Sequence, residues 1–205
     1  MKNVIVTGSN RGLGLAISNR FLEDPEIIVI GTIRSGIHPI INERFIPIYL
    51  DLENTDSIHA FNSQIAHLEI DVLINNAGVL LETGSEATIS METLRTTFNV
   101  NLFGIIELTE LVMAQLVPSS SVINITSNWG SYLNEDFDSR FPAYRMSKAA
   151  LNMYSKTLSK RLEHASVNVL NYDPGWVQTK MGGPNATLQP EKVASDLYDL
   201  IYGKI

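Results

Sequence analysis

The sequence predicts an α/β fold in which helices cover both faces of a parallel sheet, in a single domain over residues 1–205. Short runs rich in β-branched residues alternate with helical patterns along the whole chain, which is typical of a doubly wound sheet. These runs are continuously apolar, as expected for strands that are buried on both faces. With 205 residues and 44% hydrophobic side chains, the chain can bury one sizeable core.

The order of the elements follows from this pattern. Strands are expected over residues 3–7, 27–33, 45–50, 72–75, 121–126 and 167–172. Helices are expected over residues 12–23, 55–68, 90–117, 142–163 and 190–202. Leu13, Ile17 and Phe21 form one apolar stripe on the first helix, and Pro190 suits the first turn of the last helix. Residues 34–44 are too few for a full crossover helix, so an irregular connection is expected there.

A glycine-rich turn joins the first expected strand to the first helix. Its sequence is T7-G-S-N-R-G-L-G14. Gly8, Gly12 and Gly14 permit a sharp turn and a close approach of the backbone to a ligand. Amides at the start of the following helix can then bind a pyrophosphate. A tight turn without a ligand is the alternative interpretation.

Composition and charge argue against several classes of function. A formal net charge of −7 does not suit a nucleic-acid-binding surface, which needs a basic face. No uninterrupted apolar run approaches the ~20 residues of a membrane span. The chain has no cysteine, and its four histidines lack metal-ligand spacing, so we expect no disulfide and no metal. Because the first strand begins near Asn3, we expect no signal peptide and a cytoplasmic protein.

Four polar residues have the spacing of a proton-transfer site. Tyr144 and Lys148 are four residues apart on an expected helix, so their side chains project from one face. Ser127 ends the fifth expected strand, at the edge where open α/β sheets bind ligands. Asn101 lies on the preceding helix. A tyrosine and a lysine at this spacing are common by chance, and only their context favours a catalytic role.

Two other hydroxyl groups compete with Ser127 for its role. Thr126 should point to the opposite face of the strand, because successive side chains alternate. Ser131 lies in a loop beyond Gly130.

Together these segments resemble the short-chain dehydrogenase/reductase family over nearly the whole chain. The resemblance rests on the Gly-x-x-x-Gly-x-Gly turn, N75-N-A-G78, Y144-R-M-S-K148 and the D173-P-G-W-V-Q-T179 segment. The segments over residues 144–152 and 175–188 look most like the C-factor and sniffer members. The resemblance implies a three-layer doubly wound Rossmann fold without the family's usual last strand. It also implies reduction of a carbonyl compound with NADPH.

The family's catalytic tetrad matches Asn101, Ser127, Tyr144 and Lys148. Tyr144 would give a proton to the carbonyl oxygen, and Ser127 would hydrogen-bond the same oxygen. Lys148 would lower the pKa of the phenol and hold the nicotinamide ribose. Asn101 would position a water molecule.

The resemblance also implies a cofactor site along the same edge. The residues expected to bind the cofactor are Gly8, Asn10, Arg11, Gly12, Leu13, Gly14, Arg34, Asp51, Leu52, Asn76, Ala77, Gly78, Tyr144, Lys148, Pro174, Gly175, Val177 and Thr179. The segment I30-G-T-I-R34 lacks the carboxylate that NAD-selective sites place after the second strand. Arg11 and Arg34 would hold a 2′-phosphate there, which favours NADP(H) over NAD(H). Two solvated surface arginines are the alternative.

Five apolar side chains are expected to wall a pocket for an apolar carbonyl substrate, with ordinary packing as the alternative. They are Trp129, Phe137, Phe141, Trp176 and Met181. A homodimer through the helices at 90–117 and 142–163 is expected. The competing function is that of a nucleotide-binding signalling protein with little or no turnover. The complete tetrad favours the enzyme, and the missing last strand favours the alternative.

Overall fold

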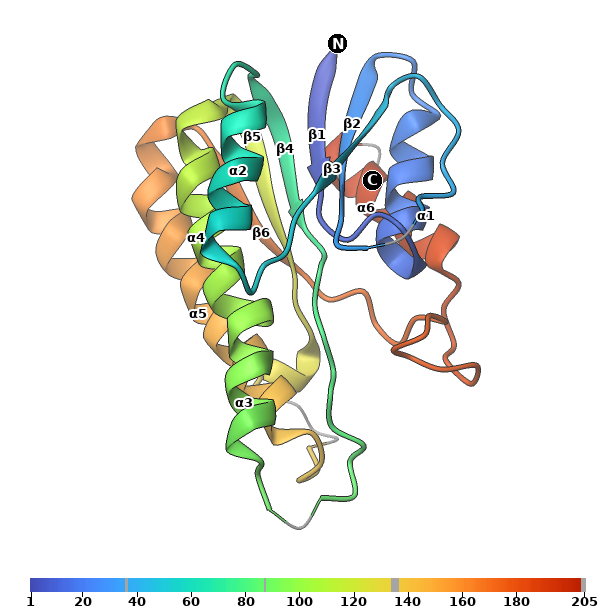
Figure 1. The fold of residues 1–205 in the computed structure, drawn as a ribbon, viewed down its shortest axis with the longest axis vertical. Coiled ribbons are helices and arrows are strands. Elements are labelled where there is room, and N and C mark those ends of the chain that lie inside the picture. Colours follow the sequence, from blue (N-terminus) through green and yellow to red (C-terminus); the bar gives the residue numbers. More distant parts are fainter. Residues whose placement is uncertain (36, 87, 134–136, 204–205) are drawn as a thin grey trace.

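One parallel sheet organises the structure, a computed structural model that describes residues 1–35, 37–86, 88–133 and 137–203 (Figure 1). Its strands are β1 (Lys2–Val6), β2 (Ile27–Ile33), β3 (Phe45–Tyr49), β4 (Ile70–Asn75), β5 (Leu116–Ile125) and β6 (Asn168–Tyr172). Their order across the sheet is β3-β2-β1-β4-β5-β6, and neighbouring strands pair in parallel. The predicted doubly wound parallel sheet is therefore confirmed.

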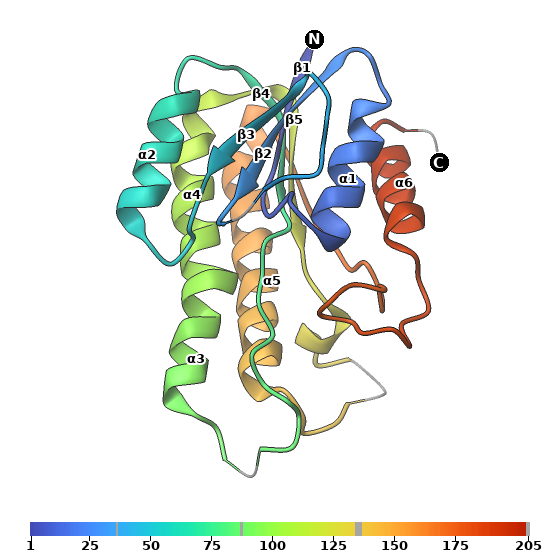
Figure 2. The ribbon, with the colours of Figure 1, turned by 45° about the vertical axis from the view of Figure 1, so that its right-hand side comes forward.

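Helices cover both faces of this sheet. They are α1 (Gly12–Leu22), α2 (Thr55–Ile65), α3 (Met91–Phe98), α4 (Gly104–Val112), α5 (Pro142–Leu162) and α6 (Pro190–Ile201). Figure 2 shows α1 and α6 on one side of the sheet and α2, α4 and α5 on the other. The strand order reverses between β1 and β4, and in such sheets ligands bind beyond the carboxyl ends of the strands at that point. The fold thus indicates where a ligand is expected to bind.

The predicted helix over residues 90–117 differs most from the structure. A π-helical turn, Asn99–Phe103, separates α3 from α4, and Leu116 already belongs to β5. Pro118 favours an extended conformation for the residue before it, which helps to end the helix. The ladder between β4 and β5 is irregular in this part of β5, where Ser119 has φ 71°. This irregular start explains why β5 was predicted to begin only at residue 121.

The segment Met91–Gln115 has the length and mean hydropathy (1.2) of a membrane span, although half of its most apolar window is buried. Ile105, Leu108 and Val112 within it are fully buried in the core. Packing inside this fold accounts for their apolar character.

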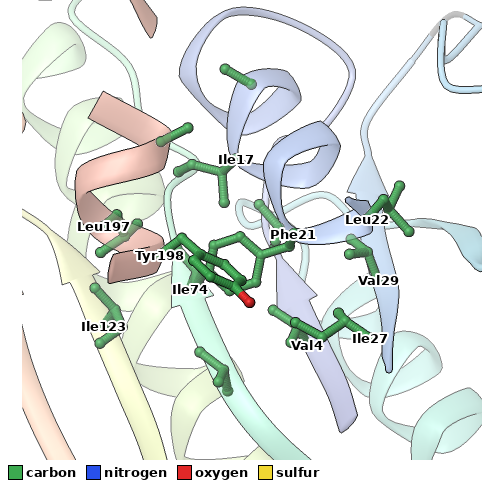
Figure 3. Close-up of a cluster of buried hydrophobic side chains, with 14 of the residues drawn as sticks. Val4, Ile17, Phe21, Leu22, Ile27, Val29, Ile74, Ile123, Leu197 and Tyr198 are labelled. Atoms are coloured by element: carbon green, nitrogen blue, oxygen red, sulfur yellow. The ribbon is translucent and has the colours of Figure 1, made fainter. Parts of the chain in front are cut away.

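Two hydrophobic cores lie on opposite faces of the sheet. Figure 3 shows one of them, in which Phe21 of α1 and Tyr198 of α6 pack over the strands. Their rings meet edge to face, with 5.2 Å between centroids. Val4 belongs to this core, whereas the next residue, Ile5, belongs to the core beneath α2, α4 and α5. Burial of both faces explains why the strands are continuously apolar.

A buried polar network ties the middle of the sheet to two helices. The Asn75 side chain donates hydrogen bonds to Asn124 Oδ1 (2.8 Å) and to Thr109 Oγ1 (3.0 Å). Asn124 donates in turn to Ser155 Oγ (2.7 Å). Since buried polar groups are costly unless they are paired, this network specifies how α4 and α5 sit on β4 and β5.

Candidate active site

The glycine-rich turn is locked against the loop after β4. Gly8 has φ 71°, and a Cβ on Gly14 would lie 2.2 Å from the Gly8 carbonyl oxygen. Asn76 Nδ2 donates to the Thr7 carbonyl (2.8 Å), and the Ala77 amide donates to Thr7 Oγ1 (2.9 Å). Glycine is therefore needed for the conformation at Gly8 and for the close approach of Gly14 to the turn, and the approach of this backbone to a ligand stays a prediction.

The start of α1 is open to an anion. Asn54 and Ser90 cap α2 and α3, but the N-cap residue Arg11 makes no side-chain capping bond to α1. Among the described residues, the first turn of α1 contains no acidic side chain. A Cβ on Gly12 would lie 3.3 Å from Thr179 Cγ2, so the segment after β6 reaches this helix start. Free amides and the positive end of the helix dipole fit a pyrophosphate here.

At the end of β2, the predicted phosphate-binding residue Arg34 lies near a carboxylate that was not expected from the sequence. Arg34 NH1 lies 4.0 Å from Glu53 Oε2, and the Arg34 side chain is 53% exposed. Asn10 Nδ2 donates to the Ser35 carbonyl (3.2 Å), which links the glycine turn to the segment after β2. Sequence reasoning missed Glu53, although its place beside Asp51 and Leu52 could have marked it as a competitor for Arg34.

Two predicted cofactor residues have apolar side chains that pack into the cores. Leu13 packs partly against the core shown in Figure 3, and Leu52 is buried in the opposite core. A Cβ on Gly104 would lie 2.1 Å from the Leu52 carbonyl oxygen, so α4 also approaches this segment closely. Asp51 accepts a hydrogen bond from the Glu53 amide (3.1 Å) within its own turn. Contacts of these residues with a cofactor remain predictions.

The loop after β4 brings two members of the predicted tetrad together. A Cβ on Gly78 would lie 3.2 Å from Asn101 Oδ1 and 3.8 Å from Lys148 Nζ. Asn101 Oδ1 accepts from the Val79 amide (2.8 Å), and Asn101 Nδ2 donates to the Val79 carbonyl (2.9 Å) and to Ser147 Oγ (3.2 Å). The Asn101 amide thus holds this loop, a role that the sequence did not predict. Its positioning of a water remains a prediction.

Lys148 is buried beside Tyr144. Its side chain donates to the Ile125 carbonyl (2.8 Å), and its ammonium nitrogen lies 5.7 Å from the centroid of the Tyr144 ring. Lys148 is only 4% exposed, and burial lowers the pKa of its ammonium group to about 8.

The Tyr144 phenol differs from the expected activated group. Burial, together with the negative charge of Asp173, raises the pKa of Tyr144 to about 12, even though a hydrogen bond with the Ser127 hydroxyl acts in the opposite direction. We expected Lys148 to lower this pKa. In the structure, desolvation outweighs any such effect. The phenol therefore holds its proton at neutral pH, as a proton donor must.

Asp173 connects the Ser127 loop with the Pro-Gly turn after β6. Its Oδ2 accepts from the Asn128 amide (3.0 Å), and its Oδ1 accepts from the Gly175 amide (3.0 Å). Sequence reasoning quoted Asp173 in the motif without giving it a role. An aspartate before Pro-Gly is a frequent turn-forming residue, which was the available signal.

Two of the five predicted pocket residues gather at Tyr144. Trp129 stacks on Phe141 with 5.2 Å between ring centroids and meets the Tyr144 ring edge on at 6.1 Å. Phe137 instead lies 4.9 Å from the guanidinium of Arg145 and is 66% exposed. An aromatic wall therefore stands beside the phenol.

The other two predicted pocket residues lie on the segment between β6 and α6. Trp176 Nε1 donates to the Gly182 carbonyl (2.8 Å), and both Trp176 and Met181 are about half exposed. Val177 of the same segment pairs with Leu188. These contacts hold the segment together, and its part in a substrate pocket stays a prediction.

Comparison with known proteins identifies the family. A profile of the short-chain dehydrogenase family matches residues 2–189, and the chain belongs to this family of oxidoreductases. It is 38% identical over 133 residues to C-signal of Myxococcus xanthus, which covers 64% of this chain and 80% of that protein.

Solved structures agree with this assignment. The carbonyl reductase Sniffer of D. melanogaster matches with a TM-score of 0.90 and 26% identity, covering 98% of this chain and 91% of that chain. A short-chain dehydrogenase/reductase from Burkholderia multivorans with bound NADP has a TM-score of 0.91 and 24% identity. That match covers 99% of this chain and 91% of the other, and it shows the fold alone. The resemblance predicted from the sequence is confirmed.

The buried Lys148 charge should make stability depend on pH. Below about pH 8 the lysine is charged in the folded and the unfolded protein, and its burial destabilises the fold by about 3 kcal/mol. Between about pH 8 and 10.5 only the unfolded protein keeps this proton, so the free energy of unfolding rises with pH.

Lys148→Met should therefore be more stable than the parent at pH 7, by up to about 3 kcal/mol. This difference should shrink as the pH rises from 8 to 9.5, because the parent then loses the buried charge. Urea unfolding across this range measures it, and Lys156→Met on the exposed face of α5 is the matched control. A difference that does not change with pH would contradict a lowered pKa.

Proposed function

We propose that this protein is an NADPH-dependent oxidoreductase that reduces a carbonyl compound to an alcohol, with Tyr144 as the general acid. The observation that carries the proposal is the placement of Ser127, Tyr144 and a buried Lys148 beyond the carboxyl end of β5. This group lies on the same edge of the sheet as the open start of α1. A binding protein would not need a buried ammonium group beside a phenol.

The cofactor would lie across the turn between β1 and α1. The amides after Gly12 would bind its pyrophosphate, and Thr179, which already contacts the site of Gly12, would bind the carboxamide. Lys148 would hold the ribose with the ammonium hydrogens that Ile125 does not use. When bound, NADPH supplies the hydride.

The residues of this chain would handle the proton. The Tyr144 phenol keeps its proton at neutral pH and would donate it to the carbonyl oxygen as negative charge develops there. Ser127 would donate a hydrogen bond to the same oxygen. The buried Lys148 ammonium would stabilise the phenolate that remains, because an unpaired charge interacts strongly in such a site. General acid catalysis of this kind contributes roughly 10²–10⁴-fold.

Tyr144→Phe should lower kcat by roughly 10²-fold or more, because it removes the proton donor and keeps the ring. The dissociation constant for NADPH and the melting temperature should change little. Loss of NADPH absorbance with a panel of carbonyl compounds measures turnover. Tyr154→Phe is the matched control, since that hydroxyl lies on the same helix but bonds Glu110. Full activity of Tyr144→Phe would rule out this role.

We propose that Arg11 and Arg34 favour NADP(H) over NAD(H). Both side chains are exposed, and the Arg34–Glu53 pair is weak, since exposed ion pairs contribute about 0–1 kcal/mol. A dianionic 2′-phosphate can therefore displace Glu53 from Arg34. The absence of an acidic residue in the segment 30–34 supports the same preference.

Arg34→Asp should reverse the preference for NADPH over NADH, because it replaces an attractive charge with a repulsive one. Glu53→Gln should strengthen NADPH binding and leave NADH binding unchanged, because it removes the competitor of the phosphate. Fluorescence titration with both cofactors at low and high salt measures these effects, and the NADPH advantage should decrease with salt. Equal affinity of the parent protein for both cofactors would overturn this preference.

The substrate is proposed to be an apolar carbonyl compound, because Trp129 and Phe141 form an aromatic wall beside the phenol. The cytoplasm is the proposed compartment, where NADPH is available and where a protein without cysteine needs no oxidising environment.

A homodimer through the helices over 90–117 and 142–163 is also proposed. Met153 of α5 is 64% exposed, and Phe103 at the end of the π-helical turn is more than half exposed. We expect a dimer by light scattering at micromolar concentration, and Met153→Asp should shift it toward monomer. Leu200→Asp is the matched control, because it also replaces an apolar side chain with a charge but lies on α6, outside this surface. A parent protein that is monomeric throughout this range would refute the dimer.

The second candidate function is a nucleotide-binding signalling protein with little turnover. The 38% identity to a protein named C-signal favours it. Tight NADPH binding together with no turnover across a broad carbonyl panel would move this function ahead of the enzyme.

A further inference from the structure

We propose that Glu82 is a positioning residue that fixes Tyr144 by capping the first turn of α5. The proposal rests on the proposed function, because it assigns Glu82 a part in placing the general acid. Glu82 lies in the loop between β4 and α3, about 60 residues away in sequence from the helix that it caps.

The start of α5 has no cap of its own. Its N-cap residue, Phe141, has the left-handed conformation (φ 58°) and makes no side-chain capping bond, and Pro142 at the next position has no N–H. Glu82 Oε1 accepts from the Ala143 amide (2.9 Å), and Glu82 Oε2 accepts from the Tyr144 amide (3.0 Å). One carboxylate thus satisfies two amides that a helix start otherwise leaves unpaired.

The second of these bonds acts on the proposed general acid itself. Tyr144 is a residue of the first helical turn, where helices fray most easily. A charged acceptor on its amide also interacts favourably with the helix dipole. Holding this amide fixes the Cα from which the phenol extends toward Ser127, and a displacement of about 1 Å at a reacting group can cost about 10²-fold in rate.

The loop that carries Glu82 is itself held by hydrogen bonds at this point. Glu86 accepts hydrogen bonds from the amides of Thr83 (2.6 Å) and Gly84 (2.8 Å), and these bonds lower the pKa of Glu86 to about 2. Gly84 has φ 83°, and a Cβ there would lie 2.6 Å from the Phe141 ring. The loop therefore braces the strained Phe141 as well as the amides that follow it.

The same loop contacts two of the other three predicted tetrad residues. Gly78 packs between Asn101 and Lys148, and Val79 exchanges two hydrogen bonds with Asn101. Glu82 adds the contact to Tyr144. A single segment, residues 78–82, thus touches three of the four predicted tetrad residues, and Glu82 is its one charged member.

Glu82→Ala should lower kcat by about 10-fold or more and leave the KM for NADPH within about 2-fold, because the phenol moves while the cofactor site stays intact. Glu82→Gln keeps one carbonyl acceptor and should lower kcat less than Glu82→Ala does. Glu110→Gln is the matched control, since Glu110 pairs with Arg161 at the far end of the same helix. It should lower the melting temperature without lowering kcat.

A double variant separates positioning from simple stabilisation. When Tyr144→Phe has removed the phenol, Glu82→Ala should no longer lower the residual rate, although it should still lower the melting temperature. The proposal is overturned if Glu82→Ala lowers the rate equally with and without the phenol. It is also overturned if the single variant loses stability but keeps the parent kcat.

A readout without turnover distinguishes this proposal from the proposed function. In protein labelled with ¹³C-tyrosine, the Tyr144 signal is identified by its loss in Tyr144→Phe. Glu82→Ala should shift that signal and Glu110→Gln should not. If the parent protein turns over no carbonyl compound, the proposed function fails, and a shifted Tyr144 signal still supports the positioning. An unshifted signal overturns the positioning whatever the activity.

Discussion

The hydrogen bonds made by the loop after β4 are the constraint on which the candidate site depends. Asn76 binds Thr7 in the cofactor turn, Val79 binds Asn101, and Glu82 binds the amide of Tyr144. The candidate cofactor turn and the candidate proton-transfer residues therefore share one support, although Thr7 and Tyr144 lie far apart in the sequence. In the proposed reaction, a shift of this loop would move the cofactor turn and Tyr144 together and so preserve their relative positions.

Burial shifts the pKa values of Tyr144 and Lys148, and burying the Lys148 charge also destabilises the fold. The Lys148 ammonium loses favourable hydration when it is buried, and this desolvation penalty lowers its pKa. The same desolvation keeps the Tyr144 phenol protonated, so one environment creates both the donor and the charge that can stabilise its conjugate base. The buried network of Asn75, Asn124 and Ser155 ties α5, the helix that carries both groups, to the sheet. The proposed role of Lys148 is therefore opposed to the stability of the fold.

Much of the fold could be predicted from local sequence, because continuous apolar strands and the Gly8–Gly14 spacing are short-range signals. The parts that escaped prediction depend on distant contacts. Glu82 reads as an ordinary polar loop residue until folding brings it to an uncapped helix start. Glu53 becomes relevant only because β2 and the turn after β3 end side by side. The start of β5 was not predicted because its serines interrupt the apolar pattern by which strands are recognised.

The geometry separates the residues proposed to select the cofactor from those proposed to transfer the proton. Arg34 and Glu53 lie at the carboxyl ends of β2 and β3, whereas Tyr144 and Asp173 lie beyond β5 and β6 on the other side of the switch point. Salt screens the exposed charges near Arg34 much more strongly than it screens the buried charges near Tyr144. Cofactor preference should therefore respond to ionic strength under conditions that leave the phenol unchanged. The helix α1 begins after β1, between these two regions. Its uncapped amides are therefore placed to bind the part of the cofactor that lies between the site near Arg34 and the site near Tyr144.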